Sequence, residues 1–205
     1  MDYEGLTRDD LLNVYALNRS WLEGQHANAQ GGVRLTSKGL ERLAGTPFLL
    51  FSFREQDARW WQSLLGDGPQ QSLLDARPPI SGEMLALQSA GMAFLWDLAR
   101  RNPYVARIVG GASLPWCEQI ASATLIRVQT CATSGHMIES RFKDGSALNR
   151  RLLQRGCSSS REIRLFAQMS ALQAMLSGGE AVPMRRLSAA ACRMPVPAQR
   201  RVNKV

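Results

Sequence analysis

A stretch of thirty residues occurs twice in this chain with the same pattern of apolar and polar positions. Residues 36–65 align on residues 124–153 without a gap, and each copy predicts a helix, a turn, an extended run ending in an Arg and Phe pair, and a second helix. The aligned pairs are Thr36/Thr124, Leu40/Val128, Leu43/Cys131, Ala44/Ala132, Thr46/Ser134, Leu49/Met137, Leu50/Ile138, Ser52/Ser140 and Leu64-Leu65/Leu152-Leu153. Amphipathic stretches of this length also match by chance, so coincidence and duplication both remain open. A duplication would make the chain two related modules.

Apolar residues at spacings of three and four predict a mostly α fold with two short extended segments. The first helix begins at Thr7, whose hydroxyl and the following acids Asp9 and Asp10 suit a helix start. Its expected inward stripe is Leu11, Val14, Tyr15, Asn18, Trp21 and Leu22, and that of a long helix near 81–102 is Met84, Leu87, Gly91, Leu95 and Leu98. Further helical segments are expected at 36–44, 58–65, 104–109 and 114–133, with extended runs at 48–53 and 136–142.

A segment rich in Gly, Pro and polar residues divides the chain at 66–82. It predicts a helical module at 1–65, for dimerisation or partner docking, and a second module at 83–178 that ends in a helix-turn-helix. Residues 179–205 form a basic tail with several prolines and little periodicity, which we expect to be partly disordered.

The charge of the chain favours an anionic partner. The net charge is +8 over 205 residues, and the tail from Ser177 contributes six cations and one acid, or +5, so the body is only mildly basic. No apolar run approaches the roughly 20 residues that span a bilayer, and the acidic N-terminus does not resemble a signal peptide. We therefore expect a cytoplasmic protein without a membrane partner.

Residues 150–186 offer the most specific chemistry, because arginines lie before, within and after two short predicted helices. In one register, a capping box of Ser159 and Glu162 opens the first helix, residues 167–169 form the turn, and residues 171–176 form the second helix. In the other register, one continuous helix covers 158–176, with Leu165, Met169, Leu172 and Leu176 as its stripe, and pairs with a helix at 146–155. Both registers place the same arginines near the phosphates of a bound DNA.

A helix-turn-helix in this segment predicts its DNA contacts. The residues expected at phosphates are Arg150, Arg151, Arg161, Arg164, Arg185 and Arg186, and those expected near base edges are Gln168, Ser170 and Gln173. A helical hairpin packed in the core, with solvated arginines outside, fits the same pattern. The alternative function is therefore an adaptor or anti-activator that binds another protein through apolar faces and residues such as Trp21 and Trp60.

The C-terminal half resembles the FlhD-type transcriptional regulators, relatives of the flagellar master regulator that also occur in integrative and conjugative elements. The matching residues are Met137, Ile138, Arg141, Phe142, Leu152, Leu153, Gly156, Ser158, Ile163, Phe166 and Ser170. The likeness covers roughly 110–180 and, more weakly, 11–65. It implies a helical transcription factor on double-stranded DNA, working as a homo-oligomer or with a second regulator subunit of the FlhC type. The chain lacks the cysteine cluster of that zinc-bearing subunit.

Other chemistry-bearing residues predict no catalytic, cofactor or metal site, so the chain is not expected to be an enzyme. The cysteines Cys117, Cys131, Cys157 and Cys192 are widely spaced, as is typical of reduced, mostly buried thiols. His26 and His136 lie in no catalytic arrangement. Trp60, Trp61 and Trp116 lack interleaved cations, so we expect them to anchor helix packing or a subunit interface.

Overall fold

The structure, a computed structural model, describes residues 4–28, 35–65, 82–142 and 146–177 and is mostly helical. The helices of this part are α1 (Arg8–Asn28), α2 (Ser37–Ala44), α3 (Ala58–Leu65), α4 (Gly82–Arg101), α5 (Pro103–Gly110), α6 (Leu114–Ser122), α7 (Leu125–Thr133), α8 (Ala147–Gly156) and α9 (Arg161–Leu176). Two short strands, β1 (Phe51–Ser52) and β2 (Glu139–Ser140), complete it. The predicted mostly helical class and both extended segments are confirmed. The 66–81 part of the predicted linker and the tail from 178 lie outside the described residues.

The two repeated stretches fold alike. Each begins with a threonine whose hydroxyl accepts a hydrogen bond from the first turn, Thr36 from the Gly39 N–H and Thr124 from the Arg127 N–H. Each helix ends in a hydroxyl that donates back to a carbonyl, Thr46 to Leu43 at 2.6 Å and Ser134 to Cys131 at 2.8 Å. These residues are aligned pairs of the repeat, so the similarity extends from side-chain pattern to capping geometry.

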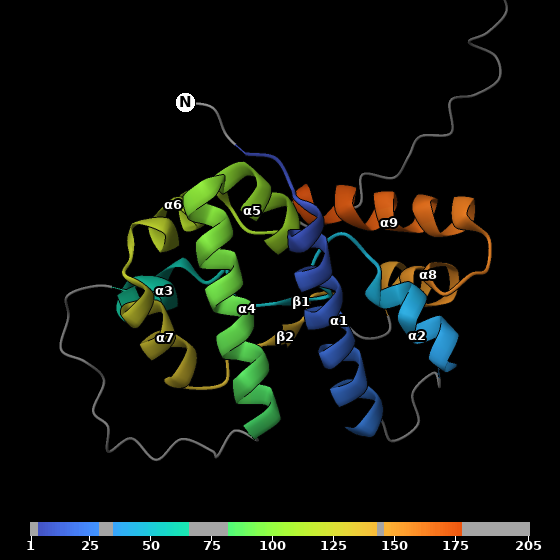
Figure 1. The fold of residues 1–205 in the computed structure, drawn as a ribbon, viewed down its shortest axis with the longest axis horizontal. Helices are drawn as coiled ribbons and strands as arrows, with labels where there is room; N and C mark the ends of the chain where they lie inside the picture. The colour runs from blue at the N-terminus through green and yellow to red at the C-terminus, as the bar shows by residue number, and fades with distance from the viewer. Residues whose placement is uncertain (1–3, 29–34, 66–81, 143–145, 178–205) are drawn as a thin grey trace, which may run out of the picture.

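The repeats meet at an approximate two-fold arrangement. Strands β1 and β2 pair antiparallel, with Phe51 opposite Ser140 and Ser52 opposite Glu139. The helix that ends each repeat packs on the helix that begins the other repeat: α3 packs on α7, and α8 packs on α2. Figure 1 shows α1 and α4 side by side across the middle, with α2 and α8 at one end and α3 and α7 at the other. Helices α5 and α6 lie between α4 and α7 in the chain and have no counterpart between α1 and α2 among the described residues.

One hydrophobic core joins both repeats. Phe48, Leu49, Phe51 and Phe53 around β1 are completely buried, and α4 lies against this run. A Cβ atom at Gly91 would lie 2.7 Å from Cζ of Phe53, so the approach of α4 to β1 requires glycine. Of the stripe predicted for α4, Leu87, Gly91, Leu95 and Leu98 are buried.

Two sequence expectations need correction, and a third is confirmed. Leu11 is 43% exposed, whereas Leu17, which we did not assign to the inward stripe of α1, is buried. The 114–133 segment is broken at Ala123, because Thr124 turns extended and caps a new helix. The aromatic residues Trp61 and Trp116 are core residues with ring centroids 5.2 Å apart, and this confirms their packing role.

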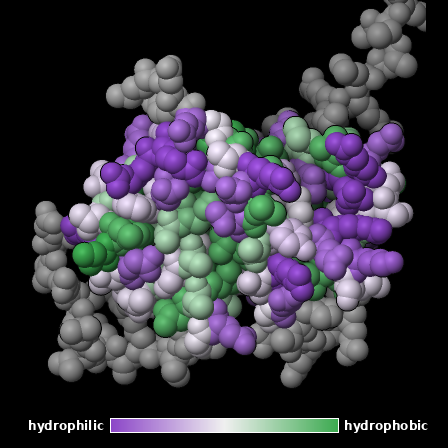
Figure 2. Space-filling view, viewed as in Figure 1, coloured by the Kyte–Doolittle hydropathy of each residue, from purple (hydrophilic) through white to green (hydrophobic). Residues whose placement is uncertain are grey.

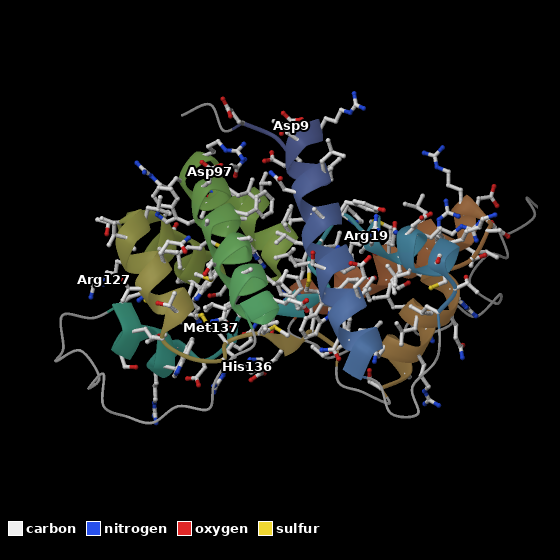
Figure 3. All side chains as sticks on the ribbon, turned by 60° about the horizontal axis from the view of Figure 1, so that its bottom comes forward. Asp9, Arg19, Asp97, Arg127, His136 and Met137 are labelled. Atoms are coloured by element: carbon white, nitrogen blue, oxygen red, sulfur yellow. The ribbon has the colours of Figure 1, made fainter. Side chains whose placement is uncertain are left out.

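Two buried amides hold the turns that follow α2 and α7. The Asn18 Nδ2 group lies 3.3, 3.2 and 2.9 Å from the carbonyl oxygens of residues 44, 46 and 48, and its Oδ1 accepts from the Leu50 N–H. Gln88 donates to the carbonyls of residues 132 and 135 and accepts from the Met137 N–H at 3.0 Å. Figure 3 labels Met137 and His136 close to one end of α4, where Met137 is buried and His136 exposed.

Replacing Asn18 by Ala tests the role of these amides. The change leaves buried carbonyls and the Leu50 N–H without a partner, which we expect to lower the free energy of unfolding by about 3 kcal/mol. Urea denaturation measures the loss. Asn13→Ala, on an exposed position of the same helix, is the matched control and is expected to change stability by less than about 0.5 kcal/mol. Equal effects of the two substitutions would contradict the assignment.

Candidate partner interface on the C-terminal helices

Helices α8 and α9 form a hairpin at one end of the molecule. Ser146 caps α8 by accepting from the Asn149 N–H at 3.1 Å, and Ser160 caps α9 by accepting from the Ile163 N–H at 3.4 Å. The last residue of α8, Gly156, lies against α2, where a Cβ atom would be 2.9 Å from Cδ1 of Leu43. The four residues 157–160 connect the two helices.

The first predicted register is wrong. Helix α9 runs without interruption through residues 167–169, and its cap is Ser160 rather than Ser159. The helix placement agrees with the second register, in which a helix near 146–155 precedes one long helix. Ala, Gln and Met at 167–169 are all compatible with helix, so no residue there breaks it.

The inward face of α9 is built from small residues, contrary to both sequence registers. Ala167, Ala171 and Ala174 are buried, with at most 6% of each residue exposed. Small side chains at spacings of four and three let α9 lie close to its neighbours. Those alanines were the signal that sequence analysis missed, because a small-residue stripe competes with the larger apolar residues for the inward position.

The outward face of α9 is apolar. Leu165 is 54% exposed, Phe166 54% and Met169 55%. We call these three residues the α9 strip. Ile163 is also exposed, so four of the ten exposed large apolar residues in the described part of the chain lie on this helix. Figure 2 shows hydrophobic residues along the upper edge, where α9 runs, beside hydrophilic residues at the same end.

Arg164, predicted to hold a phosphate, instead holds the connection between the helices. Its Nη1 donates to the carbonyl of Ser158 at 2.8 Å and to that of Ser159 at 2.9 Å. A second guanidinium, that of Arg42 on α2, donates to the Cys157 carbonyl at 3.3 Å. Arg164 therefore has a structural role, because its head group satisfies carbonyls that the helix ladder leaves free.

The remaining arginines of the hairpin point into solvent. Arg150, Arg151, Arg155 and Arg161 are exposed, and no carboxylate in the described residues forms an ion pair with them. We call these four the arginine rim. Residues 146–177 contain five arginines and a single acid, Glu162. Arg185 and Arg186, also predicted at phosphates, lie outside the described residues.

The three residues predicted at base edges share no exposed polar face. Gln168 and Ser170 are half-buried, and the Ser170 hydroxyl donates to the Phe166 carbonyl at 2.9 Å. At about 100° per residue, Gln168 and Ser170 point to opposite sides of the helix. Only Gln173 is exposed, and it lies among the apolar residues of the outward face.

The aromatic residues proposed for protein docking are also placed differently. Trp21 is buried, with 5% exposed, and its ring lies 5.5 Å from that of Phe51. Trp60 is half-buried and stacks edge-on against Trp61. Both belong to or border the core, whereas α9 carries four of the exposed large apolar residues that a partner could cover.

The thiols and acids of the described residues form no constellation for metal binding. Burial raises the pKa of the Cys117 thiol to about 12, and it also raises the pKa of Cys131 and Cys157. No group of three or more His, Cys, Asp or Glu residues within the described ranges could hold a metal ion. The side chain of His26 and the whole of Cys192 lie outside those ranges.

Comparison with known proteins yields no relative for this chain. No protein family, curated protein or solved structure matches it significantly. Among the described helices, none has the length and apolar character needed to cross a membrane.

Replacing Arg164 by Ala tests its structural role. Loss of the two charge-assisted hydrogen bonds to the connection is expected to lower the free energy of unfolding by roughly 1–2 kcal/mol. Arg161→Ala, three residues earlier and exposed, is expected to stay within about 0.5 kcal/mol of the parent protein. Urea denaturation of both variants at one salt concentration gives the comparison. A similar loss in both would show that Arg164 contributes no more than a surface charge.

Proposed function

We propose that this protein is a cytoplasmic regulatory subunit that works by binding another protein through the outward face of α9. The observation behind the proposal is the α9 strip, in which Leu165, Phe166 and Met169 each keep about half of their surface in water. Exposed apolar patches on a folded chain mark interaction sites more often than isolated exposed residues do. A role as adaptor or partner subunit needs such a surface, and the resemblance to FlhD-type regulators is compatible with it.

The energetics of the strip suit a reversible protein contact. Covering the exposed half of one Leu, Phe or Met side chain contributes roughly 1 kcal/mol, so the strip accounts for several kcal/mol of binding. Large apolar side chains at the centre of a contact are the residues that most often dominate its energy. A helix that reads base edges presents polar donors and acceptors instead, whereas beyond its first turn the only exposed polar residue of α9 is Gln173.

A photo-cross-linking amino acid at position 169 tests the proposal in cells. We expect a discrete adduct with one other protein, which is then identified by mass, purified and titrated against the parent chain. Leu165→Ala with Phe166→Ala is expected to raise the Kd of that complex at least about tenfold, because two anchors of the strip are removed.

The control places the same cross-linker at Ser20, an exposed position on α1. It is expected to give no discrete adduct. The proposal is wrong if position 169 yields no more adduct than position 20, or if the Leu165 and Phe166 changes leave the affinity unaltered.

The arginine rim favours a second candidate function, binding to the phosphate backbone of double-stranded DNA. Arg150, Arg151, Arg155 and Arg161 are exposed and lie on two neighbouring helices. Guanidinium groups on one face supply sequence-independent affinity that falls steeply with salt. In this function the chain is a transcriptional regulator whose arginine rim contacts the DNA. It binds the DNA as a homo-oligomer or together with a second regulator subunit.

Changing Arg150 and Arg151 to Ala tests DNA binding. If the rim contacts phosphates, the double variant is expected to lower the slope of log affinity against log salt by about 2, with a clear loss of affinity at low salt. Fluorescence anisotropy with a labelled duplex at several salt concentrations measures the slope. The matched control, Arg8→Ala with Arg59→Ala, removes the same charge from exposed positions on α1 and α3. Equal losses in both doubles would assign the affinity to net charge alone.

A further inference from the structure

We infer that the partner element bound by α9 is an acidic amphipathic helix, held by the α9 strip and attracted by the exposed arginines of the α8–α9 hairpin. The inference rests on the proposed protein-binding function and specifies the chemistry of its partner. Two properties of the hairpin carry it, the shape of the apolar face of α9 and the sign of the exposed charges on α8 and α9.

The apolar face is long and narrow, as a helix-binding surface is. Beyond the three strip residues, the half-buried Leu172 and Leu176 continue the line on the same side of α9, since Leu165, Met169, Leu172 and Leu176 follow one another at steps of four, three and four residues. Leu172 also packs against the core. At 1.5 Å per residue, the line from Leu165 to Leu176 is about 16 Å long, or three helical turns. An amphipathic helix covers such a line with residues at its own i, i+3, i+4 and i+7 positions.

The charges at this end of the molecule select an acidic partner. Arg161 lies one turn before Leu165 on α9, and Arg155 lies in the last turn of the adjacent α8. Arg150 and Arg151 add two further exposed cations on α8, and Glu162 is the single acid of the hairpin. Carboxylates flanking the apolar residues of a partner helix would be attracted by this arginine-rich hairpin, and charges of this kind set orientation and specificity.

The same charges disfavour a second copy of this chain as the occupant. Pairing two α9 strips would bring together two hairpins that each contain five arginines and one acid. Like charges placed across an interface oppose association. DNA is a poor occupant of the strip itself, because a duplex offers little apolar surface beyond thymine methyl groups.

Three synthetic peptides of eighteen residues test the inference with the full-length protein. One is helical, with leucines along one face and glutamates on both sides of that face. Its twin has lysines in place of the glutamates, and the third has the composition of the acidic peptide in scrambled order. We expect the acidic amphipathic peptide to bind at least about tenfold more tightly than either of the others in 0.05 M salt. The preference over the lysine twin should narrow towards 1 M salt, where charges are screened within about 3 Å.

Variants locate the binding to this surface. Met169→Glu is expected to abolish binding of the acidic peptide, and Ser20→Glu, which adds the same charge at an exposed position of α1, is expected to leave it unchanged. Arg155→Glu with Arg161→Glu is expected to reverse the preference in favour of the lysine twin. All three variants change exposed residues, and circular dichroism with thermal melting confirms that they remain folded.

The outcomes separate this inference from the proposed function. Equal binding of the acidic and lysine peptides, equal binding of the scrambled peptide, or an unchanged preference after the double arginine reversal would each overturn the acidic-helix assignment. A cross-linked adduct at position 169 with twice the mass of the chain would also overturn this assignment, because it identifies a second copy of the chain as the partner. If the acidic peptide shows no preferential binding while position 169 still cross-links to another protein, the acidic-helix assignment is wrong and the protein-binding function stands. If the acidic peptide shows no preferential binding and position 169 gives no cross-link, the acidic-helix assignment and the protein-binding function are both wrong.

Discussion

The guanidinium group of Arg141 ties together the two strands on which both halves of the molecule are arranged. It donates to the Leu49 carbonyl at 2.9 Å, to the Phe51 carbonyl at 2.5 Å and to the Glu55 carboxylate at 2.7 Å. Only 6% of the Arg141 side chain and 3% of that of Glu55 are exposed. Removing one member of such a buried pair leaves an uncompensated charge, which typically costs about 3–5 kcal/mol. The short pairing of β1 with β2 therefore depends on the buried Arg141 charge, which two backbone carbonyls and the Glu55 carboxylate stabilise by hydrogen bonds.

This central connection determines where the ends of the molecule lie. Because the strands pair antiparallel, the helix that follows each strand lands on the helix that precedes the other, α3 on α7 and α8 on α2. Asn18 and Gln88 fix the turns leading into the strands from opposite sides. The α8–α9 hairpin is thus positioned at one end of a core formed by both repeats (Figure 1).

Most of the residues behind the family resemblance fall into two groups, and Leu153, Ser158 and Ser170 are half-buried. Met137, Ile138, Phe142, Leu152 and Gly156 are buried, and Arg141 makes the central ion pair, so this part of the motif describes packing. Ile163 and Phe166 are instead exposed on α9. In this chain the motif residues therefore serve mainly to build the core, and the surface that acts on partners must be argued from exposure and charge.

Local chemistry made much of the fold predictable, because helix periodicity and capping depend on neighbouring residues. The spacing of apolar residues predicted the helices and both extended runs, and the repeat of 36–65 at 124–153 predicted two stretches of the same order. Periodicity did not decide which stripe of α9 faces inward, since both the alanines and the larger residues recur every three or four positions. The close packing of α9 against its neighbours selected the alanines. Tertiary structure alone also assigned Arg164 to backbone carbonyls, because the geometry of the connection between α8 and α9 places those carbonyls beside its head group. It also left the other four arginines of the hairpin facing solvent, because their exposure depends on how the hairpin packs.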